Sequence, residues 1–197
     1  MKLPYLLAIV TLAFFLGCNS KTEQDKKIIK EVTKMVKEKP KTEDFRERLK
    51  TTTPASEKQL QSILPTTLGS LERTEFTKSR ISQNDIASAG AIYTDGTNKK
   101  IVVSIVDGAS KDGLLAIQTH YMAQTLELNS VKSSGHEKTY EKNGLKVLET
   151  YVKKDEFYRI SYLYDMRFGV TLETHKLPRE ALDQIIEQLN LNELKNL

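Results

Sequence analysis

The most constraining feature of the sequence is a series of short turn motifs between segments with the residue pattern of β-strands. Residues 86–94 and 99–107 flank Asp95-Gly96-Thr97-Asn98, a cluster of turn-forming residues. Asn143-Gly144 separates a second pair of such segments, and Asn-Gly is a strong signal for a two-residue hairpin turn. These turns predict that neighbouring strands fold into antiparallel pairs.

Single helices alternate with these strand pairs. Residues 110–126 carry apolar side chains at helical spacing, and a second such stripe follows Pro178. The remaining strand patterns cover residues 71–78, 137–141, 145–153, 157–164 and 167–174. Short turns between strands and single interrupting helices are typical of an α+β domain. We therefore predict an antiparallel sheet of about six or seven strands with helices packed on it.

In residues 99–107 both strand faces are largely apolar, which predicts a central strand covered on both sides.

The chain begins with the pattern of a secretory signal. Lys2 precedes an apolar run at residues 6–16 that only Thr11 interrupts, as in the charged and hydrophobic regions of such signals. The run is shorter than the roughly 20 residues of a membrane-spanning helix, and a polar stretch follows Cys18. We therefore expect residues 1–17 to be removed as a signal peptide.

Phe15-Leu16-Gly17-Cys18 resembles the lipobox of bacterial lipoproteins. The resemblance implies that the Cys18 thiol receives a diacylglyceryl group, that the chain is cleaved just before it, and that the new amino group is acylated, for example with palmitate. The alternative is an unmodified thiol at the end of the signal. Because Cys18 is the only cysteine, an intrachain disulfide and a cysteine-rich zinc site are excluded. By the sorting rule of enteric-type lipoproteins, Asn19 in place of Asp favours the outer membrane in a cell with two membranes.

Residues 18–53 are expected to form a lipidated N-terminus and a basic linker. Residues 26–50 hold ten Lys or Arg against five acids, whereas the whole chain has a net charge of +4. A stripe of apolar residues predicts an amphipathic helix that ends at Pro40. The stripe consists of Ile28, Ile29, Val32, Met35 and Val36. Three roles are open for this helical stalk. It packs on the domain or a partner, it lies on an anionic membrane surface, or it is a solvated spacer.

The globular domain is expected to span residues 54–197, which is long enough for one hydrophobic core. Ser56 is placed to cap its first short helix. Within the domain, LPTTLGSLERTE, AIYTDGTNKKIVVSIVD, EKNGLKVLETY and MRFGVTLE resemble segments of a group of bacterial envelope proteins of unassigned function. The order of elements is also similar to the antiparallel-sheet fold of PsbP and Mog1 proteins. These are resemblances of fold and assign no functional residue.

No motif for catalysis or cofactor binding stands out in the sequence. The three histidines, His120, His136 and His175, lack the spacing of metal ligands, and the sequence has no nucleophile or phosphate-loop signature. We expect His120 to be partly buried in its helix, and the other two to be solvated loop residues. The sequence therefore predicts a non-enzymatic protein without a metal or another cofactor.

Tyrosines are concentrated near residue 160. Tyr158, Tyr162 and Tyr164 share one face of the predicted strand. This face either belongs to the core or forms a surface for a partner or an apolar ligand.

Together these features indicate a lipid-anchored protein of the bacterial envelope that faces outward from the cytoplasm. Its domain is expected to bind or support another envelope protein, while the lipid anchor contacts the membrane. Nucleic acid is not an expected partner, because a secreted, anchored protein does not meet it. The alternative function is a carrier that holds a small apolar ligand in a pocket between the aromatic face of the sheet and the middle helix. A filled core with an exposed apolar patch would favour the first function, and a large enclosed apolar pocket the second.

Overall fold

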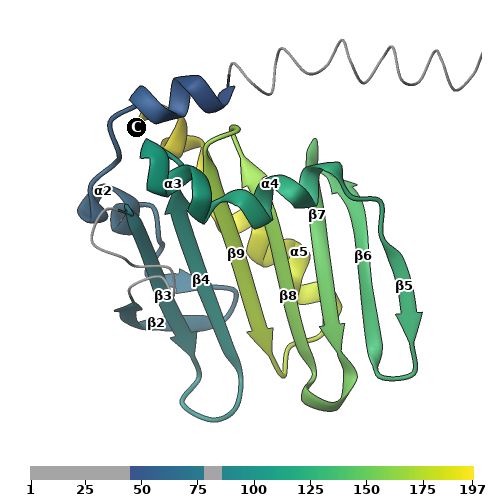
Figure 1. Cartoon of the computed structure of the whole chain (residues 1–197). Coiled ribbons are helices and arrows are strands. Elements are labelled where there is room, and N and C mark those ends of the chain that lie inside the picture. Colours follow the sequence, from purple (N-terminus) through teal and green to yellow (C-terminus); the bar gives the residue numbers. More distant parts are fainter. Residues whose placement is uncertain (1–44, 78–85) are drawn as a thin grey trace, which may run out of the picture. The chain divides into compact units, whose positions relative to one another are not determined.

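The computed structural model describes residues 45–77 and 86–197 of the chain (Figure 1). The predicted signal segment, Cys18 and the apolar stripe of the predicted linker lie outside the described residues. One compact unit spans Thr42–Leu197, and residues 45–51 within it are helical. The compact unit thus begins before residue 54, where the sequence places the start of the domain.

The described residues contain nine strands in one open sheet, and every neighbouring pair in it is antiparallel (Figure 1). The spatial order is β1-β2-β3-β4-β9-β8-β7-β6-β5. In chain order the strands are β1 (Thr67–Leu68), β2 (Leu71–Thr77), β3 (Ser88–Thr94), β4 (Lys100–Asp107), β5 (Asn129–Lys132), β6 (Gly135–Lys142), β7 (Leu145–Val152), β8 (Phe157–Tyr164) and β9 (Phe168–His175).

The predicted α+β class is confirmed, whereas the predicted count of six or seven strands is wrong. The two additional strands are β1 and β5, which lie at the two edges of the sheet. β1 has only two residues, and β5 is exposed at all four positions. A strand that short, or one without a buried face, produces no alternation of apolar and polar residues in the sequence.

The helices of the described chain cover both faces of the sheet (Figure 1). They are the first helix (residues 45–51), α2 (Glu57–Ser62), α3 (Ser110–Ala116), α4 (Gln118–Thr125) and α5 (Arg179–Gln188), with the 3-10 turns η1 (Lys153–Asp155) and η2 (Leu191–Asn196). Ser56 caps α2 as predicted, because its Oγ accepts a hydrogen bond from the Gln59 backbone N–H. The Gln59 side chain in turn accepts one from the Ser56 backbone N–H, which completes a capping box.

The prediction of one helix over residues 110–126 is wrong, because the chain forms α3 and α4 there. The break lies at Ile117, whose φ of −91° and ψ of 3° are not helical. α3 contacts β4, whereas α4 crosses to β7, β8 and β9. The apolar spacing continues through the break, so it gave no sign of the change in direction.

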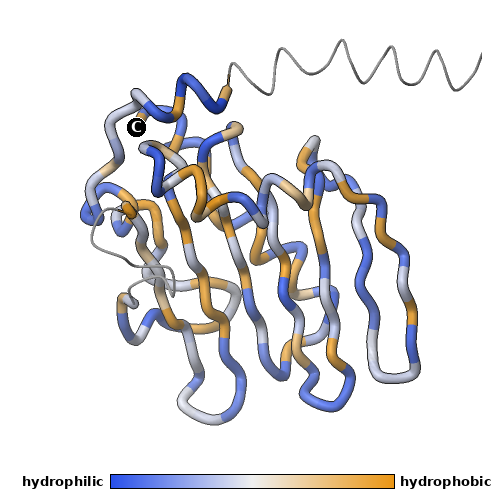
Figure 2. Tube along the Cα trace, viewed as in Figure 1, coloured by the Kyte–Doolittle hydropathy of each residue, from blue (hydrophilic) through white to orange (hydrophobic). Residues whose placement is uncertain are grey.

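Two clusters of buried side chains lie on opposite faces of the sheet. The first packs against α2, α5 and η2 and includes Ile105, Leu172 and Ile185. The second packs against residues 45–51, α3 and α4 and includes Val106 and Leu163. Because Ile105 and Val106 are consecutive in β4 yet belong to different clusters, β4 is covered on both sides. Figure 2 shows the hydrophobic residues along the central strands and hydrophilic residues at the β3–β4 and β7–β8 turns.

Candidate functional site

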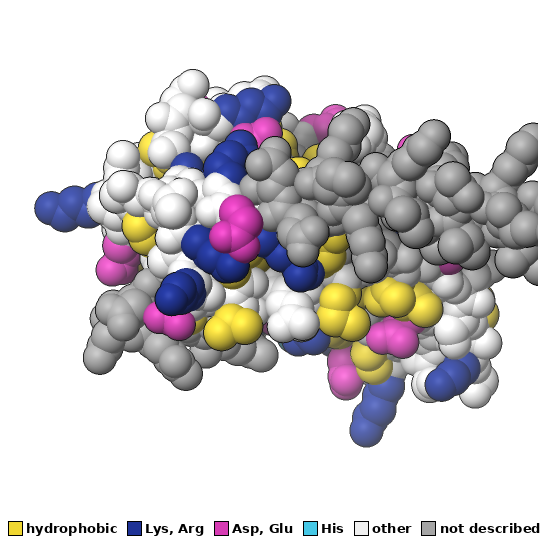
Figure 3. All heavy atoms as spheres, turned by 45° about the horizontal axis from the view of Figure 1, so that its top comes forward, with side chains coloured by type: hydrophobic (Ala, Val, Ile, Leu, Met, Phe, Trp, Pro, Cys, Tyr) yellow, Lys and Arg dark blue, Asp and Glu magenta, His cyan; other side chains and the backbone are white. Residues whose placement is uncertain are grey.

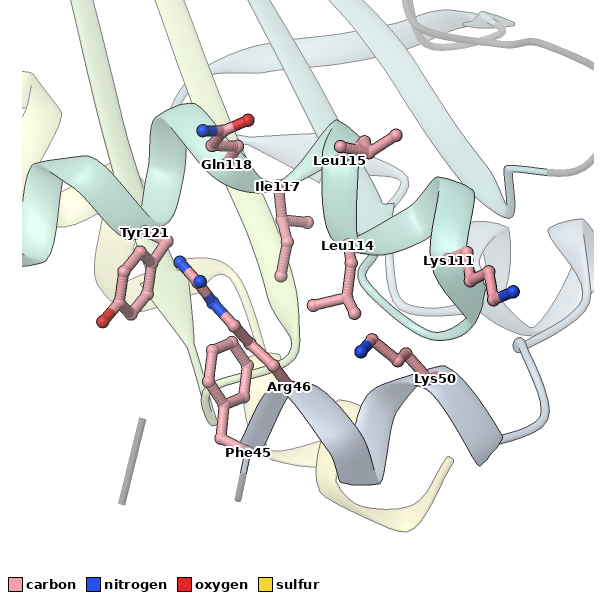
Figure 4. Close-up of a pocket in the computed structure, with 9 residues that line it drawn as sticks. All are labelled: Phe45, Arg46, Lys50, Lys111, Leu114, Leu115, Ile117, Gln118 and Tyr121. Carbon is pink, nitrogen blue, oxygen red and sulfur yellow. The ribbon is translucent and has the colours of Figure 1, made fainter. Parts of the chain in front are cut away.

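An open groove lies between helical residues 45–51 and the helices α3 and α4 (Figure 4). Phe45 and Leu49 are buried together with Ile117 and Leu163, which fastens the first helix to the sheet. The Phe45 ring also stacks on Tyr121 of α4, with 5.7 Å between the ring centres. These contacts join the two walls of the groove at its base.

The groove has a volume of about 410 Å³ and combines an apolar floor with a basic rim. Its apolar lining comes from Phe45, Leu114, Leu115, Ile117 and Tyr121 (Figure 4). Arg46, Lys50 and Lys111 also line it, from both walls (Figure 4).

The positions of two of these cations are supported by neighbouring side chains. The Arg46 guanidinium carbon lies 5.1 Å from the centre of the Tyr121 ring, a cation–π arrangement. Lys50 forms an ion pair with Glu47 one turn earlier in the same helix. The rim therefore carries a local excess of positive charge beside an apolar floor.

Exposed apolar side chains adjoin this groove. Leu115 of α3 also lines it and is 70% exposed, and Met122 of α4 is exposed as well. Figure 3 shows hydrophobic side chains beside Lys and Arg side chains on the face that carries these helices. An exposed apolar patch with polar surroundings is typical of a surface that binds a partner.

A buried carboxylate lies on the other face of the sheet. Glu149 of β7 is fully buried. His136 Nε2 lies 2.7 Å and Lys138 Nζ 3.3 Å from Oε1, while the Tyr140 hydroxyl lies 2.9 Å and Arg179 Nε 3.0 Å from Oε2. Each carboxylate oxygen thus has two partners, and the network joins β6, β7 and α5.

The surroundings of Glu149 keep it ionised. Burial by itself would raise its pKa, but the hydrogen bonds from His136 and Tyr140 and the charge of Arg179 together lower the pKa of this carboxyl below its ordinary value. A carboxylate whose acceptors are all occupied is poorly placed to take a proton from a substrate. This network was not predicted from the sequence, although an acid that shares one strand face with Val147 and Tyr151 could have indicated it.

The three tyrosines predicted as a surface lie on the face covered by α5 and η2. Tyr162 is fully buried, and its hydroxyl has no hydrogen-bond partner among the described residues. The Tyr164 hydroxyl donates to Asn192 Oδ1 at 3.0 Å, and Tyr158 stacks on Tyr151 with ring centres 4.4 Å apart. Because α3 and α4 pack on the opposite face, these tyrosines and the middle helices do not enclose a pocket between them.

The histidines have three different environments. His120 of α4 is buried, its Nε2 lies 2.9 Å from Thr171 Oγ1, and burial lowers its pKa to about 4. His136 lies in β6 against Glu149 and His175 ends β9, so the expectation that both are solvated loop residues is wrong. The three side chains are not brought together.

Within residues 45–77 and 86–197, no group of three or more His, Cys, Asp or Glu could hold a metal ion. No helix in that part of the chain has the length and apolar character to cross a membrane. Comparison of the chain with protein-family models found no match, and neither did comparisons with curated proteins and with solved structures.

Proposed function

We propose that this protein is a lipid-anchored component of the bacterial envelope whose domain holds an acidic, amphipathic segment of another envelope protein in the groove. The lipobox-like sequence that ends at Cys18 supports the anchor. The observation that supports the binding role is the combination of an apolar floor with basic residues from both walls of the groove.

Each part of the groove selects for one property of the partner. Leu114 would contact apolar side chains, and closing Leu115 off from water would add to the affinity, since full burial of a leucine side chain contributes roughly 1.5–3 kcal/mol. Arg46 and Lys111 would lie beside acidic side chains of the partner and discriminate against basic segments. A segment with one apolar and one acidic face meets both conditions.

The geometry favours a segment of a partner over an enclosed small ligand. The space between the sheet and its helices is filled by the two buried clusters. The groove instead opens at the surface of the second cluster, which contributes Phe45 and Ile117 to its lining, and Leu115 at its edge is largely exposed. A small apolar molecule bound there would remain partly in contact with water.

The proposal can be tested by photo-crosslinking in intact cells. A photoreactive amino acid replaces Gln118, an exposed residue of the groove, in the full-length chain. We expect one dominant protein adduct. The substitution Leu115→Asp should abolish this adduct, whereas Val131→Asp should leave it unchanged. Val131 of β5 is a matched control because it is 76% exposed, against 70% for Leu115, and lies at the far edge of the sheet.

A charge exchange tests the predicted chemistry of the partner. Lys111→Glu should weaken the adduct, and a compensating acid-to-lysine change in the crosslinked segment should restore it. Equal loss of the adduct in Leu115→Asp and Val131→Asp would contradict binding in the groove. An adduct with a lipid or a small molecule, and with no protein, would instead support the carrier function.

A further inference from the structure

A second hollow lies at the end of the sheet where two hairpins turn. The β3–β4 turn, the η1 segment between β7 and β8, and the end of β9 surround it, with a volume of about 660 Å³. The tube in Figure 2 is hydrophilic at both of these turns. Three segments that are distant in the sequence therefore build one polar site.

Lysines dominate the charge of this hollow. Lys99, Lys100, Lys154 and Lys176 line it, against one lining acid, Asp155. Lys176 also lies 3.5 Å from Glu156, which immediately follows the η1 turn. Residues 51–197 hold 18 basic and 19 acidic side chains, so this accumulation of positive charge is local and does not reflect a generally basic domain.

The floor of the hollow is held by strand pairing. His175 of β9 pairs with Lys100 of β4 on one side and with Phe157 of β8 on the other. The rings of Phe157 and His175 lie 5.0 Å apart. Burial and the charge of Lys100 lower the pKa of His175, and together they outweigh Glu173 and Asp155, whose charges raise it.

Backbone hydrogen bonds also hold the rim of the hollow. The Lys176 backbone N–H donates to the Glu156 carbonyl at 3.1 Å, and both residues adopt positive φ values of 57° and 44°. In the opposite turn, Asp95 Oδ1 accepts a hydrogen bond from the Thr97 backbone N–H at 3.0 Å. The lysines therefore extend from turns with defined conformations, so less ordering is needed when a ligand binds.

We propose that this hollow binds a phosphate-bearing anion between the lysines of the two hairpin turns and the His175 ring. Lysine ammonium groups bind phosphate as flexible point charges, and several of them around one hollow suit a ligand with more than one negative charge. A diphosphate or a phosphoester meets this requirement for several charges. Such a group could come from an anionic lipid headgroup or from a soluble phosphorylated molecule. This inference does not depend on the partner groove.

The test uses the full lipidated protein in nanodiscs of phosphatidylcholine, so that the anchor is the same in every sample. Lysine acetylation followed by mass spectrometry reports the accessibility of each lysine. One sample receives pyrophosphate, and another uses nanodiscs that contain phosphatidylglycerol. We expect protection of Lys154 and Lys176 in at least one of these samples, with no change at Lys58 of α2 or Lys132 of β5, which are exposed elsewhere.

The two samples distinguish the sources of the anion. Protection by phosphatidylglycerol alone would identify a lipid headgroup, and protection by pyrophosphate alone would identify a soluble ligand. For whichever probe protects, the double variant Lys154→Gln/Lys176→Gln should weaken binding by about tenfold, the scale expected for the loss of two exposed ion pairs. The matched variant Lys58→Gln/Lys132→Gln should bind as the natural chain does.

Three results would overturn the proposal. The first is the absence of protection in both samples at low salt, where exposed charges act most strongly. The second is equal weakening in the two double variants, which would indicate non-specific attraction. The third is binding of citrate as tight as that of pyrophosphate, which would show that the hollow has no preference for phosphate over other anions.

Discussion

Arg167 and Asp107 form a two-point ion pair, with Arg167 Nε 2.8 Å from Oδ1 and Nη2 2.7 Å from Oδ2 of the carboxylate. Asp107 is fully buried at the end of β4 and also accepts hydrogen bonds from the backbone N–H groups of Ala55 and Ala109. One carboxylate therefore joins the segment before α2, the start of α3 and the β8–β9 turn. These segments frame the end of the sheet where residues 45–51 and α3 form the groove.

Replacing Arg167 should cost much of the stability of the domain. Arg167→Ala leaves the buried Asp107 charge without its cation, and such a change typically destabilises a protein by about 3 kcal/mol or more. Lys50→Ala is the matched control, since Lys50 also pairs with a carboxylate, Glu47 at 2.5 Å, but both side chains are largely exposed, at 40% and 65%. We expect the control to cost less than about 1 kcal/mol. Urea denaturation of both variants measures the difference, and similar losses would contradict the structural role of the Asp107 pair.

His120 should make the fold sensitive to mild acid. Its pKa is about 4 in the folded protein against an ordinary value of 6.5, so the unfolded chain binds a proton that the folded chain rejects. The contribution of this side chain to the free energy of unfolding is therefore fully present above pH 6.5. It falls by about 3 kcal/mol as the pH decreases from 6.5 towards 4. His120→Gln should remove this part of the pH dependence when the free energy of unfolding is measured between pH 7 and 4.

Thr171→Val provides the control for His120. This variant loses the Thr171 hydroxyl that lies 2.9 Å from His120 Nε2 but keeps the buried imidazole. It should be less stable than the natural chain at pH 7 and should still lose stability between pH 6.5 and 4. A loss of the pH dependence in Thr171→Val, or its full retention in His120→Gln, would show that another group is responsible.

Glu149 should control a second, more acidic transition. Because the folded pKa lies below the ordinary value of 4.5, its contribution to stability is present above pH 4.5 and is lost as the pH falls further. Glu149→Gln should cost about 2 kcal/mol at pH 7, since it removes the charge that the surrounding donors require, and it should weaken the pH dependence below 4.5. Glu127→Gln, at an ion pair whose acid is 86% exposed, should change stability by less than about 0.5 kcal/mol. Equal effects would contradict the importance of the buried network.

Gly169 should be required because His120 packs directly over it. A Cβ atom at position 169 would lie 2.6 Å from Nδ1 and 2.8 Å from Cγ of His120. Gly169→Ala should therefore cost about 1–3 kcal/mol. The double variant with His120→Ala should lose less stability than the sum of the two single changes. Simple additivity would mean that the clash is relieved by other movements.

Cys18→Ser tests the anchor. Without the thiol that receives the diacylglyceryl group in lipoproteins, we expect a chain that is neither lipidated nor cleaved. Fatty-acid labelling and the intact mass of the protein measure both changes. A Cys18→Ser chain of normal processed mass that is still extracted with the membrane fraction would contradict the prediction.

The local elements of the fold were largely predictable. β8 was predicted at residues 157–164, where it lies. The prediction was possible because the side chains of a strand point alternately to its two faces, which produces a period of two in the sequence. The Ser56 cap was predictable because its partners are only three residues away. The basic residues of the groove could not be recognised as a group, since residues 46 and 111 become neighbours only after α3 folds against the first helix.

The sequence by itself determined the α+β class, the two main hairpin turns and the amphipathic final helix, all of which depend on spacing between near neighbours. Only the tertiary structure decided that β9 pairs with β4, that side chains of β6 and α5 surround Glu149, and that one polar hollow forms between two hairpin turns. These relationships join residues far apart in the chain. They form because both faces of the sheet are buried at the same time and because charged groups in the buried regions need partners. Neither condition produces a periodic pattern in the sequence.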